Sequence, residues 1–497
     1  MAISRTKVYD EIRTAIVDAE AGYGLGGKVF LNTDELRADQ TLRAMKKKEL
    51  QASDQSQPVA GMHFYDAKPL IEQSAVFAAL KQMPKGAILH LHNSAAVSSG
   101  WVIRNLTYRQ EAKLCNVENR YYFTVRPSSC PDNQTRLIRD MRKERKQDIA
   151  AFDEWLESLI NMKLKPSRTE HATIDQLWMD FESCFDAIRG FLQYKPFFEA
   201  YHRQLLHEFH TDNVYHIELR TSLSKLFDAD GKEYSPLEVA YILHRIVEDF
   251  RHQSPTFHGV KLILSKHKNI SNAELENALK LYESLRRIKI DLIKNRPCSA
   301  AFPGFVVGFD LVGQEDLNRS LRSFASVLLK PPIPSGPPKY YFHAGEIVGY
   351  APEANENLID AVLLDTKRIG HGYALLKHPI LWHAIRRKQI VLEVCPISNQ
   401  VLGLVRDLRN HPASFYVSQS IPITITSDDP GFWDARGVTY DYYYTFMAIA
   451  PHAGLGFLKQ LVWDSIRYSS LSDEERQNIT KIMEKQWALF VREMARK

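Results

Sequence analysis

The chain has 497 residues, of which 44% are hydrophobic and 25% are charged, and its formal net charge is +5. This is ordinary globular composition, and the length suits one large barrel with additions or two or more smaller domains. The small net charge does not require a nucleic-acid partner, no apolar stretch is long enough to span a bilayer, and five cysteines are too few for a disulfide scaffold.

The first 80 residues are expected to form helices. Residues 9–21 carry apolar side chains at helical spacing, residues 22–27 are rich in glycine, and Asn32-Thr-Asp-Glu35 provides residues that begin a helix. This is too little material for a large independent core, so residues 1–80 are predicted to be a helical extension that packs on a neighbour or a partner. The N-terminus has no apolar signal-peptide core, which fits either a cytosolic protein or one whose leader was removed.

Eight short apolar segments follow, and stretches able to form helices separate most of them. Strands that alternate with helices predict an α/β fold, a closed parallel (β/α)8 barrel of the TIM type, although a doubly wound open sheet would give a similar pattern. The expected helices include Ser235–His252, Asn272–Ile288 and Gln314–Leu329, and the tail from Leu455 is also expected to be helical. The expected strands are Ala87–His92, Val214–Arg220, Val260–Ser265, Val306–Leu311, Tyr340–His343, Arg368–His371, Ile390–Cys395 and Ile423–Ser427.

One spacing departs from this regular alternation. More than a hundred residues separate the first two expected strands, whereas a compact βα unit needs about 30. Residues 105–166 are therefore predicted to be an inserted subdomain, and the barrel to comprise residues 81–104 and 167–497. The insertion contains Cys115 and Cys130, which lie close together in a polar stretch and are either paired or two free thiols. Sequons for N-glycosylation, which leave a secreted protein open, occur at Asn105, Asn133, Asn269, Asn318 and Asn478.

Polar clusters stand at the ends of four of the expected strands, and in a β/α barrel the carboxyl ends of the strands carry the active site. Alternate residues of a strand share a face, so His90 and His92 are both expected to point into the barrel. With His343 and Asp428 they would make a set of three imidazoles and one carboxylate. This set suits Zn²⁺ or a similar divalent ion, with a water in the open position.

Each of these residues also has a simpler interpretation. A lone His-x-His pair is more often free of metal, and a lone His343 is more often a hydrogen-bonded core residue. The pair Asp428-Asp429 is compatible with a helix N-cap. Their joint placement at the strand ends of one barrel favours the metal site, because buried like-charged carboxylates are costly without a cation.

The neighbouring groups suit a hydrolytic reaction. A bound metal lowers the pKa of its water to about 7, and His371 is placed to take or orient that proton. A protonated Glu346 would donate to a ring nitrogen, and Asp429 would hold the attacking water or a second ring nitrogen. Gly313 would let its backbone N–H approach a flat ligand. The alternatives are a surface carboxylate for Glu346 and a plain turn for Gly313.

At these residues the sequence resembles the adenosine deaminase family, and more narrowly the secreted, growth-factor-type branch of that family. The narrower likeness lies in the segments 83–86, 393–402 and 408–412, the extra N-terminal helices and the insertion with its cysteine pair. It covers nearly the whole chain. The motifs that carry the family resemblance are Met83–His92, Gly308–Gly313, His343-Ala-Gly-Glu346, Arg368–Gly372 and Ser427-Asp-Asp-Pro430.

The resemblance implies zinc-dependent hydrolytic deamination of adenosine and 2′-deoxyadenosine to the inosines and ammonia. Glu346 matches the residue that protonates the purine N1, and His371 matches the base that handles the water. Asp429 matches the acid that bonds the water and N7, and Gly313 the backbone donor to N3. The matches to the zinc ligands are His90, His92, His343 and Asp428.

The expected contacts with the sugar include one departure from the family pattern. Trp178 and His267 resemble residues near the ribose, although Trp178 is equally compatible with a core position. Asn93 stands where the family usually has Asp, which is expected to contact the sugar. Asn keeps a hydrogen-bond acceptor and loses the charge, which puts sugar affinity in question but should leave metal binding intact.

The resemblance also implies partners and a location. In this branch the N-terminal helices build a homodimer, the pair Cys115–Cys130 is a disulfide, and the insertion is a candidate element for binding a cell-surface receptor or a glycosaminoglycan. The expected location is extracellular, with the lysosome as an alternative. Two other functions compete: a signalling or interaction protein on an inactive scaffold, favoured only if Asn93 abolishes substrate binding, and a deaminase of a modified adenine nucleoside.

Overall fold

The computed structural model describes residues 5–52, 58–126, 130, 134–145, 148–168, 172–287, 304–349 and 351–497. The sequon at Asn133 lies outside these residues. Within them, none of the helices combines the length and the apolar character that crossing a membrane requires.

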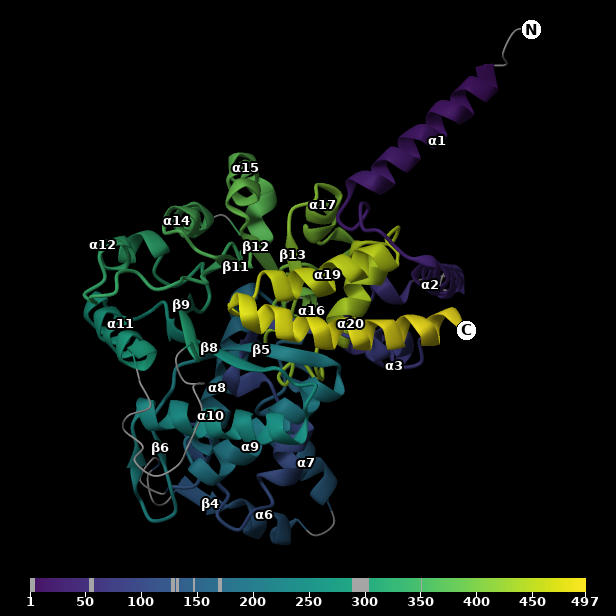
Figure 1. The fold of residues 1–497 in the computed structure, drawn as a ribbon. Helices are drawn as coiled ribbons and strands as arrows, with labels where there is room; N and C mark the ends of the chain where they lie inside the picture. Colours follow the sequence, from purple (N-terminus) through teal and green to yellow (C-terminus); the bar gives the residue numbers. More distant parts are fainter. Residues whose placement is uncertain are drawn as a thin grey trace.

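Eight parallel strands form the centre of the fold (Figure 1). They pair in the orders β1-β5-β8-β9 and β10-β11-β12-β13. Isolated bridges join Phe309 to Tyr340 and Leu91 to Asp428, so the two sheets close into one ring, and the predicted (β/α)8 barrel is confirmed. The strands are β1 (Gly86–His92), β5 (Val214–Thr221), β8 (Gly259–His267), β9 (Val306–Val312), β10 (His343–Ala344), β11 (Arg368–His371), β12 (Val391–Val394) and β13 (Ile423–Ile425).

Helices cover the outside of this ring (Figure 1). Two of the expected helices are observed, α10 (Pro236–Gln253) and α11 (Asn272–Arg287), and Ser235 starts the first of them with a capping box. The helical tail is observed as α19 (Leu455–Arg467) and α20 (Asp473–Ala495). The other helices around and between the barrel strands are α8 (Ile174–Leu192), α9 (Lys195–Thr211), α13 (Pro352–Asn355), α14 (Asn357–Leu363), α15 (Pro379–Lys388), α16 (Pro396–Val401), α17 (Ala413–Ser418) and α18 (Thr439–Tyr444).

The expected helix Gln314–Leu329 is wrong in extent. Only the short turns η7 (Leu321–Phe324) and α12 (Ala325–Leu329) are helical, and the chain before them is irregular. The reason lies in Glu315, which is 2% exposed and accepts hydrogen bonds from the backbone N–H groups of Gly345 and Glu346. These tertiary hydrogen bonds of Glu315 override the helix propensity of the segment.

The N-terminal helices divide into a packed part and a projecting part. The packed part comprises α2 (Thr33–Ala52), α3 (Phe64–Ile71) and α4 (Ala75–Gln82), and α2 lies against α20. Helix α1 (Arg5–Tyr23) extends away from the body (Figure 1). Its apolar side chains Tyr9, Ile12 and Ile16 are 64%, 56% and 55% exposed, so this helix lacks the burial that normally stabilises an amphipathic helix.

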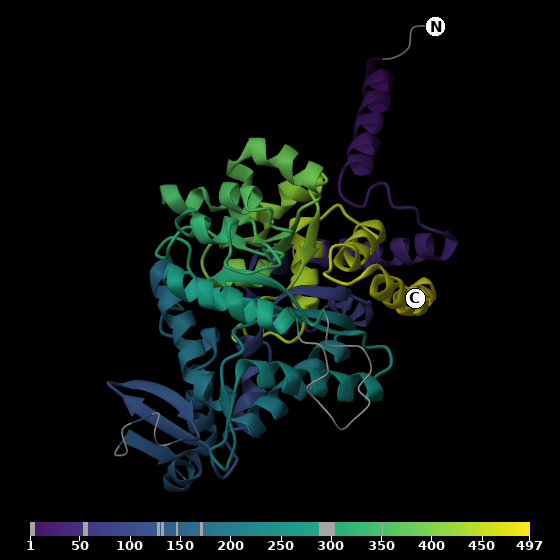
Figure 2. The ribbon, with the colours of Figure 1, turned by 60° about the vertical axis from the view of Figure 1, so that its left-hand side comes forward.

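The chain between β1 and β5 leaves the barrel and returns. It forms an antiparallel sheet in the order β3-β2-β4, which lies beyond the barrel helices (Figure 2). A disulfide joins Cys115 to Cys130. The boundaries at 80, 104 and 166 stay predictions. The elements here are α5 (Ser99–Asn105), β2 (Lys113–Val117), β3 (Arg120–Thr124), β4 (Thr135–Leu137), α6 (Ile138–Glu144) and α7 (Ile149–Ser158).

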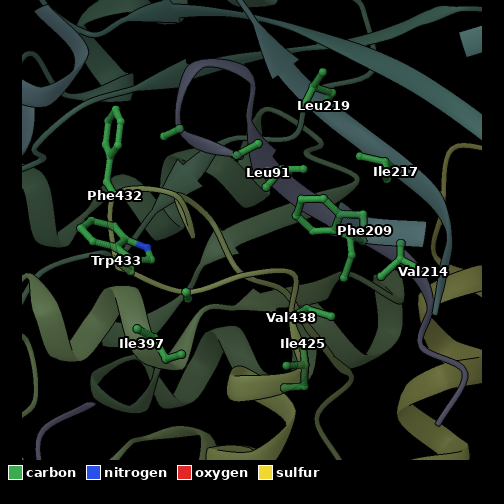
Figure 3. Packing of buried hydrophobic residues seen from close by; sticks show 14 of the residues in the cluster. Leu91, Phe209, Val214, Ile217, Leu219, Ile397, Ile425, Phe432, Trp433 and Val438 are labelled. Carbon is green, nitrogen blue, oxygen red and sulfur yellow. The ribbon is translucent and has the colours of Figure 1, made fainter. Parts of the chain in front are cut away.

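One continuous apolar cluster holds the strands to the helices around them. Figure 3 shows part of it, including Leu91 from β1, Leu219 from β5 and Phe209 from α9. All three are at most 1% exposed. The apolar contacts fix the outer faces of the strands, so that the polar residues of the inner faces meet at one end of the ring.

Candidate active site

Four side chains from three strands converge at the carboxyl end of the barrel. His90 and His92 come from the end of β1, His343 from β10, and Asp428 follows β13. Their ligand atoms all lie within 4.8 Å of one another. The Nε2 atoms of His90 and His92 are each 3.2 Å from Asp428 Oδ1. The Nε2 atoms of His92 and His343 are 3.3 Å apart.

Carboxylates behind the imidazoles fix which nitrogen faces the centre. His90 Nδ1 contacts Glu393 Oε2 at 2.8 Å, and His343 Nδ1 contacts Asp310 Oδ2 at 2.7 Å. Arg220 donates to both of these carboxylates, from Nε to Asp310 and from a terminal nitrogen to Glu393, each at 2.7 Å. An imidazole that donates from Nδ1 presents the lone pair of Nε2, which is the arrangement found behind metal-bound histidines.

The cluster has the features of a cation site. Among the residues that the structure describes, His90 Nε2 and Asp428 Oδ1 are buried without a hydrogen-bond partner. Three imidazoles and one carboxylate are typical ligands of Zn²⁺. Asp428 has a left-handed backbone, with φ +60°, and a non-glycine residue held there is strained. The donor set and the partnerless buried atoms therefore fit a divalent metal.

Glu346, His371 and Asp429 surround the same centre. His371 ends β11, and its Nδ1 lies 3.4 Å from Glu346 Oε1, while its Nε2 lies 3.9 Å from Asp428 Oδ2. All three are at most 5% exposed, so Glu346 is no surface carboxylate. His371 also has a left-handed backbone, with φ +63°.

Burial and neighbouring charges set different ionisation states within the cluster. Burial raises the pKa of Glu346 well above its ordinary value, and so does the nearby charge of Asp428; the same two causes raise the pKa of Asp429. For Asp428, burial acts in the same direction, but the adjacent imidazoles of His90 and His92 hold its pKa well below the ordinary value. The pKa values of Glu346 and Asp428 are thus shifted in opposite directions, which is the pattern expected of a proton donor beside a metal-binding carboxylate.

A cavity of about 620 Å³ opens above this cluster. All four residues expected at the substrate, Asn93, Trp178, His267 and Gly313, line it. Gly313 has φ +109°, and a Cβ there would lie 2.4 Å from His267 Nε2, so only glycine allows this approach. Trp178 is both a cavity residue and a core residue, since it is 5% exposed and packs against the ring of Phe181.

The side chain of Asn93 lines the cavity and also contacts another residue of the chain. It contacts His202 Nε2, a residue of α9. His202 Nδ1 lies 2.7 Å from the carbonyl oxygen of Phe198, and burial lowers the pKa of His202 to about 4. A neutral His202 therefore faces the Asn93 amide.

Several residues of the site carried no assigned role in the sequence. They include His202, Glu182, which lies 3.4 Å from His267, and Ser398, which donates to Asp428 at 2.7 Å. The thiol of Cys395 also lies within 4.8 Å of the ligand atoms of His90, His371 and Asp428. The segment that contains Glu393, Cys395 and Ser398 was one of the signals of the family branch, but the sequence analysis assigned it no role in the site.

Comparison with known families agrees with this geometry. The model described as adenosine deaminase matches residues 161–486, and the model described as adenosine/AMP deaminase N-terminal matches residues 2–80. The chain is 36% identical to adenosine deaminase 2 of Sus scrofa and 37% identical to adenosine deaminase 2 of Homo sapiens. Each comparison covers 98% of this chain and 94% of the relative. An adenosine deaminase of Lutzomyia longipalpis is 35% identical, over 97% of this chain and 93% of its own.

Solved structures agree on the fold. The Arabidopsis protein ADAL in complex with IMP has a TM-score of 0.56 at 15% identity, over 82% of this chain and 98% of its own. An amidohydrolase from Burkhoderia ambifaria with bound Zn has a TM-score of 0.57 at 15% identity, over 85% and 96%. The chain therefore belongs to the adenosine deaminase family, in the branch that contains adenosine deaminase 2, and it is an enzyme of that family.

Proposed function

We propose that the protein catalyses the hydrolytic deamination of adenosine and 2′-deoxyadenosine to inosine and 2′-deoxyinosine, with release of ammonia. The observation that carries this proposal is the convergence of His90, His92, His343 and Asp428 beside the buried Glu346 at the base of a cavity. The names of the adenosine deaminase relatives support the same reaction.

We assign the metal to Zn²⁺, held by His90, His92, His343 and Asp428. A divalent ion bound there supplies Lewis-acid chemistry, which makes water a competent nucleophile near neutral pH. The zinc-containing structural neighbour supports this assignment.

The remaining groups move protons and orient the base. His371, whose pKa burial lowers well below its ordinary value, is neutral and takes the proton of the attacking water. Glu346 gives its proton to the purine N1 while the water oxygen bonds to the adjacent carbon. His371 then passes its proton to the amino group, the C–N bond breaks and ammonia leaves, and the proton of the remaining hydroxyl returns to Glu346 as the carbonyl forms. Asp429 accepts a hydrogen bond from the water or donates its own proton to N7. The backbone N–H of Gly313 donates to N3.

The sugar lies toward the outer part of the cavity in this proposal. His267 and Asn93 offer polar atoms for its hydroxyl groups, and Trp178 offers an apolar surface. A 2′-deoxy sugar removes one hydroxyl and leaves the reacting atoms untouched, which is why both nucleosides are proposed as substrates.

We further propose an extracellular homodimer. The exposed apolar face of α1 supports a second copy as its partner, because such a face is normally buried.

The disulfide and the exposed sequon residues Asn105, Asn269 and Asn478 support an oxidising, secretory environment. The β2-β3-β4 sheet, which lies apart from the barrel, is the proposed contact for a receptor or a glycosaminoglycan.

The test is turnover of both nucleosides, followed by the loss of the adenosine absorbance band and by ammonia release. Zinc-loaded wild-type protein should turn over, and Glu346→Gln should lose about 10²–10⁴-fold in kcat while it keeps its metal. His343→Ala should lose both metal and turnover. Zinc-loaded protein that leaves millimolar adenosine unchanged contradicts the proposal. A substrate panel separates adenine nucleosides from modified ones.

A further inference from the structure

One short segment carries both a proposed metal ligand and the proposed proton donor. His343 and Glu346 are separated by Ala344 and Gly345, so the geometry of this turn sets the distance between metal and acid. Gly345 has φ +75°, and a Cβ there would lie 2.7 Å from Leu358. Side-chain packing does not satisfy the backbone N–H and C=O groups of such a turn, so these groups need hydrogen-bond partners.

A buried carboxylate supplies two of these partners. Glu315 Oε1 accepts from the N–H of Glu346 at 3.0 Å, and Glu315 Oε2 accepts from the N–H of Gly345 at 3.2 Å. Oε2 also accepts from Asn357 Nδ2 at 2.7 Å. Both oxygens are used, so the whole carboxylate is fixed relative to the turn.

A buried cation completes the arrangement from the other end of the segment. Lys268 is 0% exposed, lies 3.7 Å from Glu315 Oε1 and donates to the carbonyl oxygen of His343 at 3.1 Å. The pair thus contacts three backbone atoms between residues 343 and 346. Neither side chain lines the cavity, so neither is placed to touch substrate.

We infer that the buried pair Lys268–Glu315 positions the segment 343–346, so that Glu346 meets the purine N1 at the distance set by the metal bound through His343. The inference rests on the function proposed above. Lys268 and Glu315 are positioning residues. Their loss should lower kcat more than it raises KM, because the misplaced acid acts in the transition state while the other groups still bind the nucleoside.

The experiment compares Glu315→Gln with the double variant Lys268→Met plus Glu315→Gln. Gln has one acceptor oxygen, so the N–H of either Gly345 or Glu346 loses its partner in both variants. Both should show kcat lowered about 10–100-fold, the effect of a misplaced catalytic group, with KM and inosine affinity within about threefold of wild type. Metal content should stay at the wild-type level. The double variant should recover the midpoint of thermal unfolding, since replacing both charges avoids an unpaired buried ion.

A second buried pair of a lysine and an acid, which also binds backbone N–H groups, provides a matched control. Asp212 pairs with buried Lys85 at 3.8 Å and accepts from the backbone N–H groups of Val438 and Thr439. Asp212→Asn should lower the unfolding midpoint and leave kcat near wild type. An equal loss of kcat in this variant would show a general stability effect and overturn the inference.

Four other outcomes decide between a positioning role and the alternatives. If the double variant recovers both the wild-type kcat and the wild-type unfolding midpoint, the pair contributes only to stability. A loss of metal in proportion to kcat would place the effect at His343 and not at Glu346. Zinc-loaded wild-type protein without any turnover would remove the proposed function itself, whereas active wild type with undiminished Glu315→Gln removes only the positioning role.

Discussion

Single residues inside the barrel form a chain of contacts that reaches from one imidazole to another. Arg220 joins Asp310 to Glu393, and these carboxylates hold His343 and His90. Arg368 extends the network from Glu393 to Glu218, at 2.5 Å and 2.6 Å. All of these groups are buried, so each charge depends on its neighbours for the solvation that water would otherwise supply.

Asp310→Asn is expected to weaken metal binding about 10–100-fold, because it removes the negative charge that makes His343 a better ligand. Competition with a chelator of known affinity measures this directly. Glu218→Gln is the control, since Glu218 belongs to the same network and touches none of the four proposed ligands; it should affect stability and leave metal affinity unchanged. Equal metal affinities for Asp310→Asn and wild type would contradict the prediction.

Asn93→Asp should lower KM for adenosine about fivefold, because a charged acceptor makes a hydrogen bond stronger by about 1 kcal/mol than a neutral one. The new carboxylate should also raise the pKa of His202 from about 4, since His202 Nε2 faces this side chain. Steady-state kinetics and NMR titration of the imidazole measure the two effects. An unchanged KM for both nucleosides would remove residue 93 from the sugar site.

At the scale of elements, α1 and α2 have similar lengths, but α2 packs against the body of the molecule and α1 does not. Helix α2 buries Leu42 and Ala38 against the body, and Glu35 accepts from Trp487 of α20 at 2.8 Å. Helix α1 has no buried residue among those described. Most helical stability in proteins comes from tertiary packing of an apolar face, and α1 gains none from the body of the chain.

Removal of residues 1–23 is expected to convert the proposed homodimer into a monomer while the barrel keeps its metal. Sedimentation analysis of full-length and shortened protein measures this change. Ile12→Asp plus Ile16→Asp tests the same face without shortening the chain, and Asp10→Asn is a control on the same helix. A shortened chain that stays dimeric at the same concentration would place the interface elsewhere.

At the scale of the whole molecule, the sequence predicts features that come from repeated apolar segments or from short motifs of neighbouring polar residues. Eight apolar segments predicted the barrel, and the polar clusters at the ends of four of them put His90, His343 and Asp428 at one rim. The residues that support them were not predictable in this way, because Arg220 is 90 positions from Asp310 and 173 from Glu393 along the chain. Glu315 shows the same limit: its segment has helical propensity, and only the contact with the 343–346 turn makes it irregular.

As the pH is lowered, the free energy of unfolding should begin to fall at a higher pH than protonation of carboxylates alone would cause. Burial lowers the pKa of His411 and of His258 to about 3, and that of His202 to about 4. Between about pH 6.5 and these values the unfolded chain binds protons that the folded chain does not, so the free energy of unfolding falls as the pH is lowered through this window.

Urea unfolding at several pH values between 7 and 4 measures this decline. His411→Gln should show a shallower slope, by at most about 1.4 kcal/mol per pH unit, the value for one proton. A free energy of unfolding that stays constant over this range would contradict the prediction.

The ring of strands closes beside the residues that are proposed to hold the metal. His92 N–H donates to the carbonyl oxygen of Asp428, and Asp428 N–H donates to that of His90, at 3.0 Å and 3.2 Å. A chain that stops before Asp428 has neither this seam nor the fourth proposed ligand. Such a fragment is therefore expected to bind the metal more weakly than the chain that includes Asp428, however well its early helices fold.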